Sequence, residues 1–306
     1  MYCRELAVEA LRNGISAYPK KEEQKPLSHH PCFNQEAHYK YGRMHLPVSP
    51  ECNIQCRFCT RGLNRTENRP GASRAILTPD EAINAVAKAV EDLPELTVVG
   101  IAGPGDSLAS EHALEVFEAI QTRFPSLIKC ICTNGLLLTD YAERIIEADI
   151  RTVSVTINAV DPAILQQICS HIIYNGKYIS GWEAADILID AQLEGINRIV
   201  ELGAVVKINT VLIPGINDQH IEQIAKTVDD YGVKILNIMP MIPAFEFKNM
   251  KAPDCTDLKT ARNSSSNYLK IFRHCQQCRA DACGVPASGM DKSDYIYGNV
   301  RKGAGA

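Results

Sequence analysis

The 306-residue sequence has few aromatic residues, little net charge and no long apolar run. Aromatic side chains make up 6% of the chain, with a single tryptophan, so aliphatic packing must dominate its core. A formal net charge of -4 disfavours polyanions and anionic membrane surfaces as partners. No apolar stretch is long enough to span a membrane, and the N-terminus lacks the apolar core of a signal peptide. We therefore expect a cytoplasmic protein that binds neither nucleic acid nor membrane.

Twelve cysteines stand out against this composition. Disulfides are rare in the cytosol, so clustered cysteines in such a protein indicate metal or redox chemistry. Their spacing forms three groups and one isolated upstream residue: Cys52, Cys56 and Cys59; Cys130 and Cys132; Cys275 and Cys278; and Cys32.

Strand-like and helix-like runs alternate along the middle of the chain. Strands are expected at 44–48, 96–102, 127–132, 152–157, 204–212 and 234–239, and helices at 79–93, 110–123, 139–148, 181–202, 219–231 and 256–272. No hairpin between adjacent strands is expected. This alternation predicts an α/β fold with a parallel sheet, built as a partial six-stranded (β/α)6 barrel. We divide the chain into an N-terminal extension (1–43), the barrel (44–250) and a C-terminal helix with a Cys-x2-Cys tail (251–306).

Unusual residues follow the predicted strands at their carboxyl ends, where parallel α/β barrels gather their chemistry. In strand order they are the cysteine triad, Gly103–Asp106, Cys130–Asn134, Asn158, Asn209 and Met239. This convergence predicts one active site.

Cys52, Cys56 and Cys59 lie in one loop and can hold three irons of a [4Fe-4S] cluster. The fourth iron then lacks a protein ligand and can bind the amino and carboxylate groups of S-adenosylmethionine (SAM). An electron from the cluster cleaves the sulfonium bond and yields a carbon radical. Structural zinc is the alternative, but it needs four ligands and this loop offers three.

The triad resembles that of the radical SAM superfamily. In this resemblance Phe58 lies beside the adenine, and the glycines after the second strand allow the backbone to approach the SAM amino group. Asn158 and Asn209 match positions near the ribose or carboxylate of SAM. The alternative is that each is a turn residue at the end of its strand. The SAM-binding residues implied are Phe58, Gly103, Gly105, Asp106, Asn158, Asn209 and Met239.

Further segments resemble the NifB family, the carbide-inserting radical SAM enzymes of nitrogenase cofactor biosynthesis. They comprise residues 30–33, 42–45, 52–56, 68–71, 102–106, 133–135, 213–218 and 275–282. The resemblance is to the short archaeal form, which stops before a carrier-like C-terminal domain.

The resemblance implies two more [4Fe-4S] clusters, with ligands in both terminal extensions. One is expected on Cys32, Cys275 and Cys278, and the other on His45 and Cys130 with a further ligand. A SAM methyl group would move to a cluster sulfide and lose hydrogen to a radical from a second SAM. Its carbon would become a carbide as the clusters fuse into an eight-iron precursor.

The final steps of that chemistry need deprotonation, and Glu67 and Arg69 are the catalytic candidates. A solvated ion pair is the alternative for these two residues. His45 as a core histidine and Cys32 as a structural thiol are also alternatives.

One departure from the family lies just after the triad. Relatives usually carry a cysteine there, whereas residues 60–71 contain none. Cys132 shares a strand face with Cys130 and is a candidate replacement ligand. If Cys132 is not a ligand, we expect the cluster on His45 and Cys130 to be loosely held.

The resemblance also implies partners: an iron–sulfur cluster donor, an electron donor such as a ferredoxin, and a downstream cofactor carrier or scaffold protein. Two other interpretations stay open. A different radical SAM enzyme with auxiliary clusters would act on an organic or peptide substrate, without needing Cys32 and His45. A non-catalytic iron–sulfur scaffold or electron carrier would not explain Phe58 or Gly103–Asp106.

Overall fold

The computed structural model describes residues 25–274, 278–289 and 291–298 of the chain. Its main sheet is centred on six parallel strands that neighbour one another in chain order: β1 (Gly42–His45), β5 (Leu96–Ile101), β6 (Ile128–Thr133), β7 (Ile150–Thr156), β10 (Val205–Leu212) and β11 (Ile235–Pro240). Short β12 (Lys270–Ile271) pairs with β11, and β13 (Cys283–Gly284) runs antiparallel to β1. The predicted α/β fold with a parallel sheet is confirmed.

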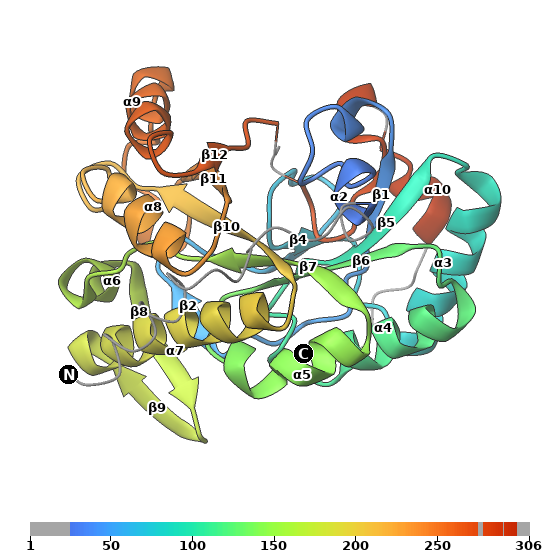
Figure 1. The fold of residues 1–306 in the computed structure, drawn as a ribbon, viewed down its shortest axis with the longest axis horizontal. Helices are drawn as coiled ribbons and strands as arrows, with labels where there is room; N and C mark the ends of the chain where they lie inside the picture. Colours follow the sequence, from blue (N-terminus) through green and yellow to red (C-terminus); the bar gives the residue numbers. More distant parts are fainter. Residues whose placement is uncertain (1–24, 275–277, 290, 299–306) are drawn as a thin grey trace.

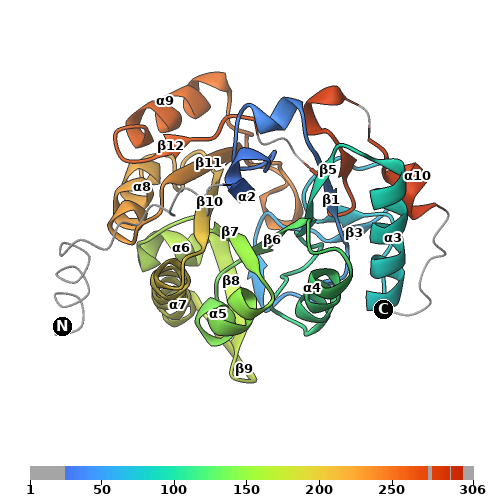
Figure 2. The same ribbon diagram turned by 45° about the vertical axis from the view of Figure 1, so that its right-hand side comes forward.

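Helices cover the outside of the curved sheet (Figures 1 and 2): α3 (Pro79–Asp92), α4 (His112–Arg123), α5 (Leu138–Glu147), α7 (Gly181–Glu201), α8 (Ile221–Asp230) and α9 (Cys255–Ser265). Outward-facing strand residues such as Ile131, Val153 and Val155 are fully buried in the apolar layer beneath them. Thr78 caps α3 in a reciprocal capping box with Glu81, as the Thr-Pro start predicts. Among the residues described, no helix is both long and apolar enough to cross a membrane.

The inward faces of the strands form a polar interior. The strand register aligns Gly100 with His45 on one side and with Cys130 on the other. Cys132 and Lys207 both align with Ser154 of β7. Alternate strand residues share a face, so sulfur, imidazole and ammonium groups meet inside the barrel.

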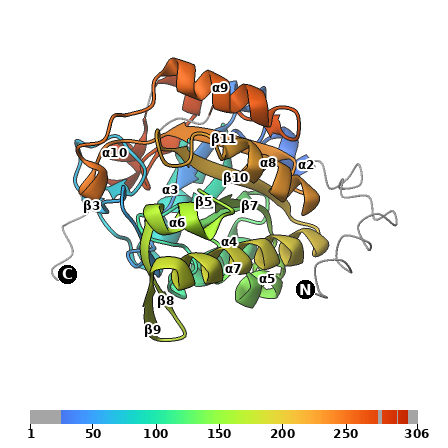
Figure 3. The same ribbon diagram turned by 90° about the vertical axis from the view of Figure 1, so that its left-hand side faces the viewer.

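A β-hairpin corrects one prediction. β8 (Cys169–Tyr174) and β9 (Lys177–Ser180) pair antiparallel, and β2 (Ile54–Cys56) joins them as a third strand. Asn175 and Gly176 at the turn have φ angles of 51° and 71°, the conformation that an Asn-Gly turn favours. The hairpin projects from the barrel (Figure 3), and the expectation that no hairpin occurs is wrong.

Other element boundaries also differ from the predictions. α9 ends at Ser265, before residue 272, because the hydroxyls of Ser264 and Ser266 donate to nearby backbone carbonyls and compete with the helix. α6 (Pro162–Ile168), capped by Asp161, was not predicted. The remaining short elements are α2 (Lys25–Ser28), η1 (Ala37–Tyr39), β3 (Gly62–Leu63), β4 (Ala72–Ser73), η2 (Phe245–Phe247), η3 (Pro286–Ser288) and α10 (Ser293–Tyr297).

A buried ion-pair network fixes the C-terminal segment against the barrel. The carboxylate of Asp281 is fully buried and accepts from Nε of Arg74 at 2.9 Å and Nε of Arg279 at 2.8 Å. Arg279 also donates to the carbonyls of Asn64 and Glu67 in the loop after the triad. The carboxylate therefore connects the C-terminal segment to the stretch between the triad and α3.

We expect Asp281→Ala to destabilise the fold much more than Asp294→Ala, although both carboxylates pair with Arg74. Loss of Asp281 leaves the buried Arg279 guanidinium without a counter-ion and Arg74 with only the exposed Asp294, which costs about 3–5 kcal/mol. The side chain of Asp294 is 82% exposed, so its ion pair contributes less than about 1 kcal/mol. Urea denaturation of both variants measures the difference, and equal losses would contradict the anchoring role of Asp281.

The same carboxylate makes stability depend on pH with a defined sign. Burial opposes ionisation of Asp281, but hydrogen bonds from Arg279 and Arg74 hold its pKa below the usual range. Its contribution is complete above the pKa of an unfolded aspartate, about 4. It is lost as the pH falls through the lower folded value. The stability gap between wild type and Asp281→Ala should therefore narrow at acidic pH, as denaturation across a pH series would measure.

Candidate active site

A cavity of about 250 Å³ opens at the carboxyl ends of the barrel strands. The predicted site residues that line it are Cys52, Cys56, Phe58, Cys59, Arg69, Gly105, Asp106, Cys132, Asn158 and Met239. Of the residues predicted for SAM binding or catalysis, Glu67, Gly103 and Asn209 are not among its lining residues, and neither are the predicted ligands Cys32, His45, Cys130 and Cys278.

The triad loop is held in place by backbone hydrogen bonds. β2 ends at Cys56, and the N–H of the next residue, Arg57, donates to the carbonyl of Ile168 at 2.8 Å. Cys59 N–H donates to the Cys56 carbonyl at 3.0 Å. Burial raises the pKa of Cys52 to about 12 and also raises those of Cys56 and Cys59. Such thiols need a compensating positive centre to ionise, and an iron cluster supplies one.

The turn after β5 is pressed against the residues just before the triad. Gly105 N–H donates to the Ser49 carbonyl at 2.6 Å, and Asp106 N–H donates to the Glu51 carbonyl at 2.7 Å. A Cβ on Gly105 would lie 1.8 Å from that Glu51 oxygen, so only glycine fits. This close approach couples the glycine-rich turn to the triad loop.

The buried carboxylate of Asp106 is already engaged by the protein. It accepts from the Thr133 hydroxyl at 3.0 Å and from Asn134 N–H at 2.5 Å. Burial raises the pKa of Asp106, while these bonds act in the opposite direction. The Asn134 side chain donates to Asn53 at 2.6 Å and lies 3.9 Å from Cys52 Sγ. Asp106 thus fixes Asn134, a residue that the Thr-Asn-Gly stretch signalled but our site prediction did not include.

The two asparagines predicted to bind SAM differ in their position relative to the cavity. Asn158 Oδ1 accepts from Val211 N–H at 2.9 Å on the cavity wall. Asn209 Oδ1 instead accepts from the Asn237 side chain at 3.0 Å, two residues before Val211 on β10. The structure therefore brings only Asn158 to the cavity.

Arg69 and Glu67 form an ion pair at 2.5 Å, with the arginine on the inner side. The Arg69 side chain is 15% exposed and lines the cavity, whereas that of Glu67 is 48% exposed. Hydrogen bonding to Asn64, together with Arg69, lowers the pKa of Glu67 and weakens it as a base.

A second group of donor side chains lies in the barrel interior next to the cavity. The neighbouring thiols of Cys130 and Cys132 shift each other's pKa, raising that of Cys130 and lowering that of Cys132 to about 7, and Cys132 lines the cavity. A Cβ on Gly100 would lie 3.3 Å from the His45 ring and 3.8 Å from the Cys130 Cβ, so the glycine gives both residues room. His45 Nδ1 donates to the Arg279 carbonyl at 3.1 Å, which leaves Nε2 as the nitrogen with a lone pair. Burial, with a further effect of Arg43, lowers the pKa of His45 to about 4.

Cys32 and Cys278 approach the same region from opposite ends of the chain. Arg43 on β1 donates to Cys278 Sγ at 3.3 Å. Burial opposes the charge on Arg43, yet Cys278 and Cys32 raise its pKa, so both thiols lie near the guanidinium. Cys32 also packs in one small apolar cluster with Cys130. Cys275, the remaining predicted ligand, lies outside the described residues.

These donors fit iron–sulfur clusters better than single ions. Within the described ranges, no three His, Cys, Asp or Glu side chains are grouped tightly enough to hold one metal ion. A [4Fe-4S] cube is wider and takes thiolate or imidazole ligands from separate segments. The buried Nε2 of His30, near Cys32, has no hydrogen-bond partner among these residues, which fits a site that receives a further group.

Known structures share this architecture. A profile of the Radical SAM superfamily matches residues 46–228. Streptococcus suis SuiB has a TM-score of 0.57 at 13% identity, covering 90% of this chain and 60% of its own. Methylornithine synthase PylB has a TM-score of 0.53 at 12% identity, covering 83% and 72%. At this identity the likeness concerns the fold alone.

Relatives with higher identity cover most of the chain. The FeMo cofactor biosynthesis protein NifB of Methanocaldococcus infernus is 46% identical over 261 residues, 85% of this chain and 86% of that relative. NifB of Methanocaldococcus jannaschii is 45% identical over 258 residues, 84% of this chain and 86% of that relative. NifB of Klebsiella pneumoniae is 41% identical over 275 residues, 87% of this chain and 58% of that relative. The chain therefore belongs to the radical SAM superfamily and, within it, to the NifB family.

Proposed function

We propose that this radical SAM enzyme fuses two [4Fe-4S] clusters and inserts a SAM-derived carbide to form the eight-iron precursor of the nitrogenase cofactor. The supporting observation is the continuity of the barrel interior. Cys132 lines the cavity at the triad and shares a strand face with Cys130 on β6, and His45 lies across Gly100 from Cys130. Substrate clusters bound to these residues would lie next to SAM.

The resident cofactors follow from the superfamily: a [4Fe-4S] cluster on Cys52, Cys56 and Cys59, and SAM in the adjoining cavity. When bound, they supply the carbon and the radical that removes hydrogen from it. The protein holds the triad backbone through β2 and brings the Gly105 turn against the preceding residues. Asn134 orients the Cys52 side of the loop.

The substrate clusters would use the remaining donors. One would bind Cys32, Cys275 and Cys278, with Arg43 balancing thiolate charge beside Cys278. The other would bind Cys130 and the Nε2 of His45, whose ring is oriented by its bond to the Arg279 carbonyl.

The proton route uses the Glu67–Arg69 pair. An arginine keeps its proton in proteins, so Glu67 is the member that accepts one. Arg69 faces the cavity and orients the carboxylate behind it. The half-exposed position of Glu67 lets the proton leave to solvent.

The same chemistry requires three kinds of partner. An iron–sulfur donor protein would load the substrate clusters, an electron donor such as a ferredoxin would reduce the SAM cluster, and a carrier or scaffold protein would accept the eight-iron product.

Anaerobic incubation of the cluster-loaded protein with methyl-labelled SAM tests the proposal. We expect the label to enter the metal cluster, because the methyl carbon becomes its carbide. Cys52→Ala is the control and should abolish both SAM cleavage and labelling, since it removes one triad ligand. Label found only in small organic or peptide products would reject carbide insertion in favour of another radical SAM reaction.

A second experiment concerns the missing loop cysteine. We expect Cys132→Ala to lose up to about four irons per chain after reconstitution, the content of one cluster. Cys255 is exposed on α9, so Cys255→Ala is the matched control and should keep its iron. Iron content in Cys132→Ala equal to that of the control would exclude Cys132 as a ligand.

A further inference from the structure

His30 is a fully buried residue two positions before Cys32, and nothing in the proposed chemistry uses it. Its ring packs against Phe33 with centroids 4.5 Å apart. Its Nε2 atom has no hydrogen-bond partner among the described residues. Buried polar atoms in native folds are nearly always paired, so this nitrogen points to a partner other than the described protein atoms.

The other ring nitrogen decides what kind of partner that is. Nδ1 of His30 accepts a hydrogen bond from the backbone N–H of Cys32 at 3.1 Å. Nδ1 must therefore carry a lone pair and no proton, which excludes the doubly protonated ring. In the remaining tautomer the proton is on Nε2. Nε2 is a donor, and it could ligate iron only if the bond to Cys32 were broken.

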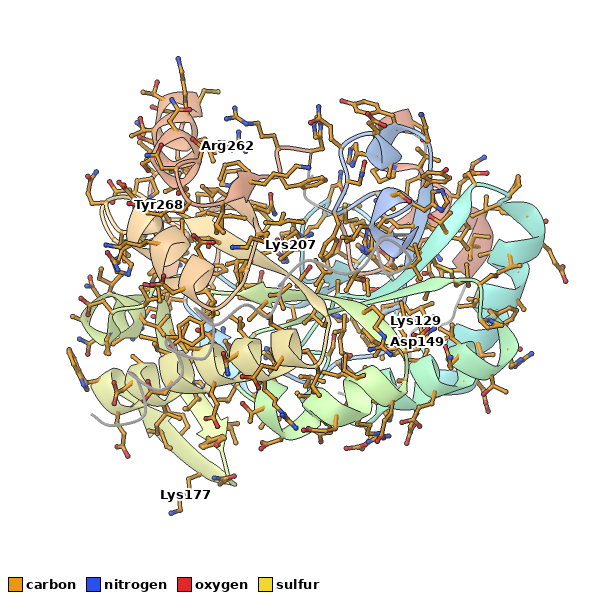
Figure 4. The ribbon with its side chains drawn as sticks, viewed as in Figure 1. Lys129, Asp149, Lys177, Lys207, Arg262 and Tyr268 are labelled. Atoms are coloured by element: carbon orange, nitrogen blue, oxygen red, sulfur yellow. The ribbon has the colours of Figure 1, made fainter. Side chains whose placement is uncertain are left out.

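The surroundings of this donor favour an anionic acceptor. Lys207, near the middle of the molecule in Figure 4, donates to the Cys32 carbonyl at 3.0 Å. Its ammonium lies 4.6 Å from the centroid of the Phe33 ring. Arg43 donates to Cys278 Sγ on the other side of the same region. Cationic and N–H groups from three segments thus surround Cys32 and Cys278, an arrangement that suits sulfur atoms carrying negative charge.

We propose that Nε2 of His30 donates a hydrogen bond to a sulfur atom of the cluster bound at Cys32, and so tunes that cluster without ligating it. This inference rests on the cluster proposed above for Cys32, Cys275 and Cys278. An N–H···S bond stabilises the reduced cluster more than the oxidised one, because the reduced form carries more negative charge. The bond therefore raises the reduction potential.

A redox titration of the reconstituted full chain, followed by electron paramagnetic resonance, tests the proposal. The reporter is the signal that disappears in Cys32→Ala. In His30→Asn the amide oxygen can still accept from Cys32 N–H, but no donor reaches the Nε2 position. In His30→Gln the longer side chain carries a donor to that position.

We expect His30→Asn to keep its iron and to shift the midpoint potential of the reporter to a more negative value. His30→Gln should return it toward the wild-type value. His29 is an exposed neighbour, so His29→Asn is the matched control and should leave the potential unchanged.

Three outcomes would contradict the inference in different ways. A wild-type midpoint potential in His30→Asn would exclude a hydrogen bond from His30 Nε2 that tunes the cluster. Loss of iron in His30→Asn, to the extent seen in Cys32→Ala, would make His30 a ligand or a packing residue. If Cys32→Ala itself loses neither iron nor signal, no cluster is bound at Cys32. The proposed function and the hydrogen bond from His30 would then both be rejected.

Discussion

Two groups of candidate metal ligands, the triad and the donors around His45, depend on the ion pairs of the buried Asp281 carboxylate. This carboxylate pairs with Arg74 and Arg279 in the interior. Arg279 also donates hydrogen bonds from its other N–H groups to backbone carbonyls of the loop after the triad. The backbone carbonyl of Arg279 also orients the His45 ring. One anchor therefore sets the loop after the triad, the first strand and the C-terminal segment relative to one another.

The barrel was predictable because each β/α unit carries its own local signals. Thr78 and Pro79 mark the start of α3, and runs of β-branched residues mark the strands beside it. The hairpin had a local signal too, since Asn175-Gly176 is a strong turn former, but the flanking runs lack clean alternation. The end of α9 followed from serine hydroxyls that compete for backbone carbonyls, an effect that apolar periodicity does not register.

The candidate site was predictable where its residues are contiguous in sequence, as in the triad with Phe58. It was not where tertiary contacts decide a role. The sequence does not show that the Asp106 carboxylate already accepts hydrogen bonds from Thr133 and Asn134. The unpaired nitrogen of His30 becomes visible only when the packing around it is known. The pairing of Arg74 with Asp281 joins residues more than two hundred positions apart, with no pattern in the sequence to announce it.

The hairpin of β8 and β9 has a consequence for how the protein acquires its iron. Because β2 is hydrogen-bonded to β8, main-chain hydrogen bonds of the fold help to order the backbone around Cys56. A loop that became ordered only on binding would lose part of its affinity to conformational entropy. Here part of that entropy is lost when β2 pairs with β8, so more of the coordination energy is available to retain the cluster. The hairpin thus lowers the entropic cost of binding at the triad, although it contributes no ligand of its own.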